Sequence, residues 1–248
     1  MRSIRHLALA TFAAPLALGL AACSSGEEAA GTGEPVAAVP APAGSSWSET
    51  ASRTPEGGWL VGNPDAPIKL VEYGSLTCPA CALFSTEGSR ALHENYIDTG
   101  RVSYELRSVM IHGIVDVLLT RVLECAPANV AVPLADQMWA NNATITAPFS
   151  ANQAALEAAY NLPEDQRFVT MAQVGGVTEF FAARGISADQ TNACLADAAA
   201  VQALAETTQA QATEDAVTGT PTFFLNDVRI DSTRWAEVEG AIQRAGAR

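Results

Sequence analysis

Two cysteines separated by two residues are the first feature of this sequence that could do chemistry. Cys78 and Cys81 lie in the stretch SLTCPACALF, residues 75–84. Such a pair can form a reactive disulfide, supply half of a metal site or act as a structural crosslink. Each possibility describes a different kind of protein, and the choice depends on the elements that hold the pair.

The flanking residues place the pair between a strand and a helix. Residues 68–73 (IKLVEY) are rich in strand formers and follow the turn-like segment GNPDAP. From residue 81 to 97 the apolar residues fall at helical spacing, and Gly100 is expected to end this helix. Residues 101–109 (RVSYELRSV) then alternate as a strand does. A strand, a helix and a second strand in this order favour a right-handed parallel unit.

A cysteine at the start of a helix is expected to ionise easily. The free amide groups of the first turn and the partial positive charge of the helix end stabilise a thiolate at Cys78, and Pro79 is tolerated because its missing N–H had no partner there. Cysteines in such positions have pKa values of about 3.5 to 7.5. We therefore expect Cys78 to be the nucleophile and Cys81, one turn further on, to be shielded and to resolve a mixed disulfide. The alternative is a purely structural disulfide.

Other site chemistries find little support in the sequence. A zinc site needs four ligands, but the chain has no second CxxC pair, and one of its three histidines, His6, lies in a segment expected to be removed. His93 and His112 have no nucleophile motif beside them and are expected at or near the surface. We therefore expect no metal, no cofactor and no Ser-His-Asp hydrolase site.

The start of the chain has the pattern of an export signal. A short segment with two arginines and no acid precedes the apolar residues 7–20, which are too few for a membrane span. The sequence LAAC at residues 20–23 resembles a bacterial lipobox. Residues 1–22 are therefore expected to be cleaved, leaving Cys23 lipidated and the protein anchored in a bacterial cell membrane, inner or outer, facing the periplasm. The alternative is ordinary cleavage with Cys23 incidental.

Composition separates a linker from a folded domain. Residues 24–55 are dominated by Ala, Gly, Pro, Ser and Glu and show no hydrophobic period, so residues 23–55 are expected to form a flexible linker before a domain at 56–248. The formal charge of the whole chain is −13, and removing residues 1–22 takes away two arginines and no acid. Nucleic acid is therefore a poor partner.

Four cysteines remain if Cys23 carries a lipid. An even number in an exported protein favours disulfides. Proximity pairs Cys78 with Cys81, which leaves Cys125 with Cys194. The alternative for these two is a pair of separate buried thiols. If they are bonded, closing a loop of roughly 70 residues would contribute on the order of 4 kcal/mol of stability and would make this bridge a brace.

The C-terminal part supplies a second pattern. In VTGTPTFFLNDVRI, residues 217–230, a strand at 222–225 is entered through Thr220 and Pro221. A turn, a short partner strand at 228–230 and a closing helix at about 233–245 follow. Proline at the start of a strand is tolerated at a sheet edge or in a cis turn.

Two segments, PDAPIKLVEYGSLTCPAC at 64–81 and GTPTFFLN at 219–226, resemble the DsbA-like thiol oxidoreductases of the thioredoxin superfamily, and the similarity extends over about residues 59–248. The resemblance implies that Cys78 attacks and Cys81 resolves. It also implies that Pro221 is a cis-proline facing them, with Thr220 before it.

The resemblance also assigns a role to an acid. Glu72 stands where DsbA-type sequences carry a buried carboxyl group that helps to move a proton at the resolving thiol. The alternative is an ordinary charged residue on an exposed strand face. The residues between the cysteines are Pro79 and Ala80, without the histidine of the best-known members, which leaves the redox potential open.

The middle of the chain is expected to be helical. The resemblance implies an α/β thioredoxin-like fold with parts at about 59–110 and 217–248 and an all-helical insertion at about 111–216. Four aromatic and sulfur side chains in the insertion are expected to pack in the core rather than to form a substrate surface: Met138, Trp139, Phe180 and Phe181. The helices are expected at 114–125, 150–160, 163–176, 177–185 and 187–211, with capping boxes at Ser150/Gln153 and Ser187/Gln190.

Three functions are compatible with these patterns. The first is a dithiol oxidase that introduces disulfides into reduced exported polypeptides and is reoxidised by a membrane redox partner. The second is a reductase or isomerase that uses the same cysteines, and the third is a non-catalytic lipoprotein scaffold. Known isomerases of this fold dimerise through an added N-terminal domain, for which residues 24–55 leave no room, so we expect a monomer.

Overall fold

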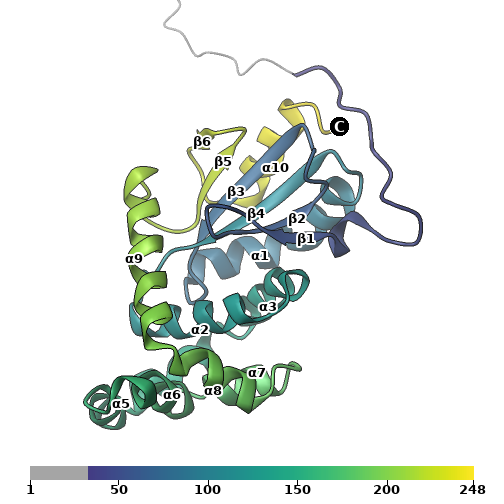
Figure 1. Ribbon diagram of the computed structural model, residues 1–248. Coiled ribbons are helices and arrows are strands. Elements are labelled where there is room, and N and C mark those ends of the chain that lie inside the picture. The colour runs from purple at the N-terminus through teal and green to yellow at the C-terminus, as the bar shows by residue number, and fades with distance from the viewer. Residues whose placement is uncertain (1–32) are drawn as a thin grey trace, which may run out of the picture. The chain divides into compact units, whose positions relative to one another are not determined.

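The computed structural model describes residues 33–248 (Figure 1). The expected signal peptide at 1–22 and the expected lipidation site Cys23 lie outside the described residues. Within the described residues, no helix is both long enough and apolar enough to cross a membrane.

A six-stranded sheet is the centre of the described chain. Its spatial order is β1-β2-β4-β3-β5-β6. Strands β3 and β4 are parallel, and the other neighbours are antiparallel. The strands are β1 (Ala51–Arg53), β2 (Trp59–Gly62), β3 (Ile68–Gly74), β4 (Val102–Ser108), β5 (Thr222–Leu225) and β6 (Val228–Ile230).

Helix α1 (Pro79–Leu92) connects the two parallel strands, as the sequence predicts. It continues into a π-helical segment, His93–Ile97, and the chain then turns through Gly100, whose φ of +70° favours glycine. Helix α10 (Trp235–Arg244) packs against α1. The approach is so close that a side chain at Gly88 would overlap the Trp235 ring.

Helices occupy the chain between β4 and β5, which confirms the predicted helical insertion. Figure 1 shows α5 to α8 gathered beyond α2 and α3, away from the sheet, and α9 leading back toward β5. The helices are α2 (Ile114–Cys125), α3 (Ala128–Ala140), α4 (Asn142–Ala151), α5 (Gln153–Tyr160), α6 (Glu164–Val174), α7 (Val177–Ala182), α8 (Ala188–Ala196) and α9 (Ala198–Glu214).

One hydrophobic core joins the sheet to the insertion. Side chains of alternating β3 and β4 residues, such as Leu70 and Leu106, are fully buried together with residues of α1, α2 and α3. Met138, Trp139 and Phe181 lie in this core, and Phe180 packs against it. Their predicted role in packing is therefore confirmed.

Two details of the helix predictions are wrong. The helix expected at 187–211 is interrupted at Asp197, whose side chain accepts a hydrogen bond from the Ala200 amide and so starts α9. The capping box at Ser187 and Gln190 is confirmed. The one expected at Ser150 is absent because this residue continues the last turn of α4.

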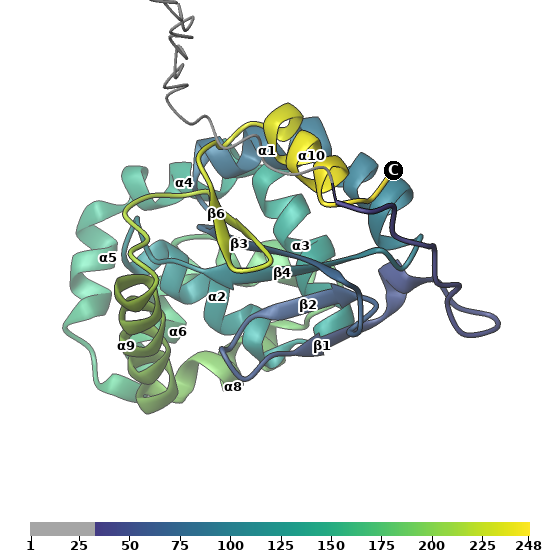
Figure 2. The same cartoon turned by 90° about the horizontal axis from the view of Figure 1, so that it is seen from above.

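Residues 33–55 are not a flexible linker, so the sequence expectation is corrected for this part of 23–55. The amide of Val36 donates to the Gly246 carbonyl oxygen at 2.9 Å, and the Val39 amide donates to Thr99 at 2.9 Å. Further along, β1 pairs with β2 (Figure 2). The composition suggests disorder because it offers little apolar area, but backbone hydrogen bonds to the C-terminal residues and to the sheet order this segment instead.

Candidate active site

Cys78 occupies the junction that the sequence predicts. It is the N-cap residue of α1, directly before Pro79, and its carbonyl oxygen accepts the first helical hydrogen bond, from the Ala82 amide at 3.0 Å. Its thiol lies 3.3 Å from the carbonyl oxygen of Thr220. The peptide bond between Thr220 and Pro221 is cis. The fold thus brings together two segments that are more than a hundred residues apart in the sequence.

Strand pairing explains how the loop of Pro221 reaches the cysteines. Strand β5 runs antiparallel to β3, with Thr222 opposite Tyr73 and Phe223 opposite Glu72. The cysteine pair follows β3 and the proline precedes β5, so both lie at the same end of this strand pair. The Thr220 hydroxyl is buried and has no hydrogen-bond partner among the described residues.

The two cysteines have different surroundings. Both are free thiols, and the exposed fraction is 4% for Cys78 and 0% for Cys81. The hydrogen bond with the Cys81 thiol lowers the pKa of Cys78 to about 5 against the opposing effect of burial, and the amides of Cys81 and Ala80 contribute in the same direction. Burial raises the pKa of Cys81. Cys78 is therefore a thiolate at neutral pH while Cys81 keeps its proton.

The cause of the low pKa differs in part from the sequence expectation. Amides of the first helical turn contribute, as expected, but the neighbouring thiol contributes more. The spacing of two residues matters for this reason, because it places the second thiol one helical turn away, where it can donate to the first.

Glu72 is a buried acid, which excludes the exposed alternative. Its side chain is fully buried, and Oε2 accepts a hydrogen bond from the Tyr104 hydroxyl at 2.8 Å, while Oε1 has no hydrogen-bond partner in the part of the chain that the structure describes. Burial raises its pKa to about 8, against the effect of Tyr104 and with additional effects of the negative charges at Asp136 and Cys78. Glu72 in turn raises the pKa of Cys81, although less than burial does.

Sequence reasoning missed a second buried carboxylate, Asp116, which holds the loop before Cys78. It is fully buried on α2, where its oxygens accept hydrogen bonds from the hydroxyls of Ser75 at 3.0 Å and Thr77 at 2.8 Å. They also accept from the backbone amides of Thr77 at 3.2 Å and His112 at 2.9 Å. Burial raises the pKa of Asp116, and these donors oppose the shift.

The missed carboxylate had a signal in the sequence. In IVDVLLTRVLEC, residues 114–125, Asp116 is the only acid before the last turn of an otherwise apolar helix. Buried acids are rare unless they are paired, so a partner was to be expected. Ser75 and Thr77 supply that partner, and Trp139 fixes the same loop by donating from its ring N–H to the Ser75 carbonyl oxygen at 2.9 Å.

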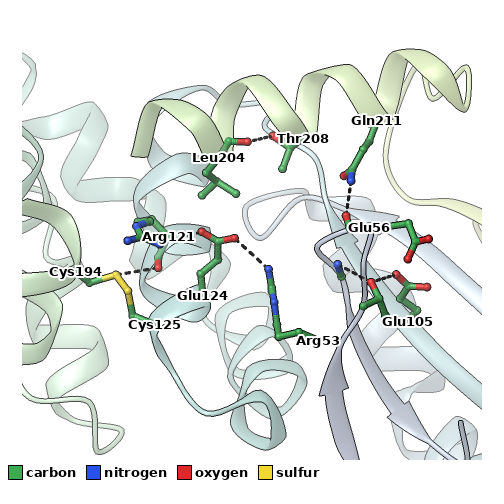
Figure 3. A network of polar contacts seen from close by, with 12 residues as sticks. Arg53, Glu56, Glu105, Arg121, Glu124, Cys125, Cys194, Leu204, Thr208 and Gln211 are labelled. Carbon is green, nitrogen blue, oxygen red and sulfur yellow. Dashed lines mark hydrogen bonds and ion pairs between the residues drawn. A yellow bond between two sulfur atoms is a disulfide. The ribbon is translucent and has the colours of Figure 1, made fainter. Parts of the chain in front are cut away.

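The second cysteine pair, unlike the first, lies in the helical insertion. Cys125, the last residue of α2, is bonded to Cys194 of α8, with their Cα atoms 6.2 Å apart (Figure 3). Next to it are the ion pairs that Glu124 makes with Arg53, at 3.0 Å, and with Arg121, at 3.2 Å. The disulfide therefore connects two helices of the insertion that are far apart in the sequence.

A cavity of about 250 Å³ lies between α2, α9 and the turn before β2, in the region of Figure 3. Its polar lining includes Glu56, Arg121 and Glu124. Neither cysteine of the first pair lines this cavity. We therefore do not include it in the candidate active site.

Several known proteins are similar to this chain in sequence. The family model described as thioredoxin matches residues 54–244. Disulfide bond formation protein D of Bacillus subtilis is 35% identical over 54 residues, which cover 22% of this chain and 24% of that protein. A putative protein-disulfide oxidoreductase of Rickettsia typhi is 26% identical over 186 residues, covering 75% of this chain and 61% of that protein. The matched part of the chain thus spans less than two thirds of the length of each of these two relatives.

Solved structures give a similar result. A protein-disulfide isomerase from Novosphingobium aromaticivorans superposes with a TM-score of 0.66 at 25% sequence identity, covering 74% of this chain and 94% of that one. The alpha-DsbA1 protein of Wolbachia pipientis superposes with a TM-score of 0.62 at 19% identity, covering 78% of this chain and 93% of that one. The second likeness shows the fold, and it agrees with the sheet and helical insertion described above.

Proposed function

This chain belongs to the thioredoxin family, and we propose that it is a DsbA-like thiol:disulfide oxidoreductase that introduces disulfide bonds into exported proteins. The observation that carries the proposal is the opposite shift of two pKa values within one CPAC motif. The Cys78 value is lowered to about 5 and that of Cys81 is raised. A structural crosslink needs no such difference, whereas thiol exchange does.

The first step is attack on the oxidised pair. A substrate thiolate attacks Cys78 Sγ, a new substrate–Cys78 disulfide forms, and the Cys78–Cys81 bond breaks. Cys81 leaves as a thiolate in a buried site and takes up one proton. Glu72, which is protonated at neutral pH because its pKa is about 8, is a buried candidate donor whose charge acts on Cys81.

The second step releases the product. A second substrate thiolate attacks its neighbour's sulfur in the mixed disulfide, the substrate disulfide forms, and Cys78 leaves as a thiolate. The substrate loses two electrons and the protein pair gains them. Because the Cys78 thiolate is stable at neutral pH, it is a good leaving group, which favours the oxidase direction.

Pro221 and Thr220 are proposed to align the substrate. Their backbone lies beside the Cys78 thiol, at the end of β5. An extended polypeptide can pair with exposed backbone groups of such a segment as an added strand. Recognition would then depend on main-chain hydrogen bonds rather than on a substrate sequence, as suits an enzyme acting on many unfolded chains.

A reductase or isomerase is the second candidate. It is favoured by the similarity to the Novosphingobium structure described as a protein-disulfide isomerase. Equilibration of the pure protein with glutathione buffers separates the two. We expect a potential well above that of thioredoxin, roughly −270 mV, and a value near that figure would assign the reducing direction instead.

We also propose that the protein is a monomeric lipoprotein of the periplasm, anchored through Cys23 and reoxidised by a membrane redox partner. The support is the lipobox-like LAAC sequence at residues 20–23. Mass spectrometry of the mature N-terminus tests this point. We expect a diacylglyceryl group on Cys23 and release of the Cys23→Ser variant into the soluble periplasmic fraction. An unmodified Cys23 would leave the enzyme without this anchor.

A further inference from the structure

A small hollow separates Glu72 from a second acid. Its volume is about 10 Å³, roughly the space of one water molecule. It is lined by residues of β3, β4, α1, α3 and the π-helical segment His93–Ile97, and Glu72 and Asp136 are both among them. Glu72 lies on one side of the hollow, and its Oε1 has no hydrogen-bond partner among residues 33–248. The negative charge of Asp136 adds to the effect of burial in raising the pKa of Glu72.

Asp136 is held by α1, the helix that carries the cysteine pair. Its Oδ1 accepts a hydrogen bond from the Ser85 hydroxyl and its Oδ2 accepts one from the Ser89 hydroxyl, both at 2.7 Å. The serines are one helical turn apart and fix both oxygens. Two neutral donors satisfy the carboxylate without neutralising its charge, so it remains able to exchange a proton.

His93 lies beyond Asp136 on the route outward. It lines the same hollow, it is partly exposed, and its Nδ1 lies 3.1 Å from the Ser48 hydroxyl in the segment before β1. The Asp136 charge acts on His93, as does that of Asp98. The imidazole is therefore placed between a half-buried acid and the surface.

We propose that Asp136 and His93 complete a proton path that leads from Cys81 through Glu72 to the surface. This inference rests on the proposed thiol exchange, since without it Cys81 has no proton to gain or lose. Asp136 acts through Glu72 and is therefore a positioning residue rather than a catalytic one.

The proton balance of the exchange requires such a route. When the Cys78–Cys81 bond breaks, Cys81 leaves as a thiolate and takes one proton from Glu72, which becomes a buried carboxylate. The Asp136 carboxylate then takes one proton from a protonated His93 or from solvent and passes it to Glu72 through a water in the hollow, which leaves Asp136 a carboxylate again. During reoxidation the Cys81 proton leaves by the reverse sequence. No electron enters or leaves along this path.

Several ionisable groups face the path and set its pH dependence. Tyr104 of β4 donates to Glu72, and the charge of Cys78 acts on Glu72 from α1. Burial raises the pKa of Asp136, which His93 opposes. Burial lowers the pKa of His93, and Asp98 opposes this. Burial thus shifts the two pKa values in opposite directions, upward for the Asp136 carboxyl group and downward for the His93 imidazole.

The test measures single-turnover reduction of the oxidised protein by dithiothreitol, followed by tryptophan fluorescence, over a range of pH. Asp136→Asn should slow the step at neutral pH by about 10-fold or more, in the range that positioned proton transfer contributes. It should also shift the midpoint of the pH profile downward, because Glu72 loses a negative neighbour. The exposed Asp65→Asn variant removes the same charge elsewhere and should match the wild type.

A double variant distinguishes a path from a general loss of packing. Glu72→Gln with Asp136→Asn should react no more slowly than Glu72→Gln alone, since both changes interrupt one route. Should Asp136→Asn fail to fold, His93→Gln keeps both serine contacts and is expected to slow the step in the same direction.

The proposal is overturned if Asp136→Asn, or His93→Gln in its place, reacts like the wild type at every pH while Glu72→Gln is slow. Protons would then enter from the substrate side. The proposed function fails separately if the Cys78→Ser variant still oxidises a reduced peptide at the wild-type rate.

Discussion

The two cysteine pairs of this protein differ in what surrounds them. Cys78 and Cys81 sit on one helix, with a buried acid behind them and the loop of Pro221 in front. Cys125 and Cys194 join two different helices beside partly buried ion pairs. The first pair is free in the structure and the second is bonded.

The comparison teaches that the environment of a thiol, rather than its identity, decides its chemistry. Cys78 gains a donor in the Cys81 thiol and in helix amides, so its thiolate is stabilised. The second pair has neither a helix start nor a buried acid next to it among the residues described. We accordingly expect the first pair to exchange and the second to support the fold.

The largest effect expected is on activity at the first pair. Cys78→Ser should abolish oxidation of a reduced model peptide, since no other thiolate is available for the attack. The variant with both Cys125→Ala and Cys194→Ala should retain most of the wild-type rate below its unfolding temperature. Peptide oxidation followed by mass spectrometry checks both. If the two variants lose activity equally, the separation of roles is wrong.

The second effect is on stability at the other pair. The double change Cys125→Ala and Cys194→Ala opens a loop of 69 residues between the bonded positions. We expect the free energy of unfolding to fall by about 4 kcal/mol, the loss of chain-entropy stabilisation for such a loop. Urea unfolding of the oxidised wild type and the variant measures it. A difference below about 1 kcal/mol would mean that the bridge is not a brace.

The third effect concerns pH and the acid behind the first pair. Glu72 has a pKa of about 8 in the folded protein and an ordinary value of 4.5. The folded state therefore binds the proton more tightly, and stability should fall as pH rises from about 4.5 to about 8.

Glu72→Gln should reduce this fall in stability. Wild type and variant are both unfolded by urea in the oxidised form, in which Cys78 does not titrate. In the reduced form Cys78 acts in the opposite direction, because its pKa is lowered and its contribution grows as pH rises above about 5. An identical pH dependence of wild type and variant would show that Glu72 is ionised in the folded protein.

The smallest effect is expected at the loop before Cys78. Asp116→Asn keeps the shape of the side chain but replaces one acceptor oxygen by a donor, which faces other donors. We expect a loss of about 2 kcal/mol of stability, as for an unsatisfied buried group. The Cys78 pKa should rise slightly because the loop is held less firmly. Thermal unfolding and a thiolate titration measure these changes, and a variant as stable as the wild type would contradict the network.

The sequence predicted the reactive part of the molecule well because its signals are local. Spacing within CPAC, a strand before it and the GTP segment before another strand are short patterns with a direct structural meaning. Helix α2 and strands β5 and β6 lie at the residues expected from such patterns. The pairing of Cys125 with Cys194 was expected from the even number of cysteines and the proximity of Cys78 to Cys81, with separate buried thiols as the alternative, and the structure shows the bond.

The structural features that could not be predicted from the sequence depend on tertiary contacts. Asp136 is an ordinary acid in the sequence, and only the packing of α3 against α1, where Ser85 and Ser89 donate to it, places it near the site. Residues 33–55 lack a hydrophobic pattern, and backbone partners from distant parts of the chain order them. Neither feature leaves a local pattern.

The most direct test of the account is the pH dependence of alkylation at each cysteine of the first pair. The fully reduced pair, with the second disulfide intact, is treated with iodoacetamide at a series of pH values, and mass spectrometry locates the label. We predict that labelling of Cys78 rises with a midpoint near pH 5 and that Cys81 remains unlabelled over the same range. A Cys78 midpoint near 9, the value of an ordinary thiol, would contradict the central claim.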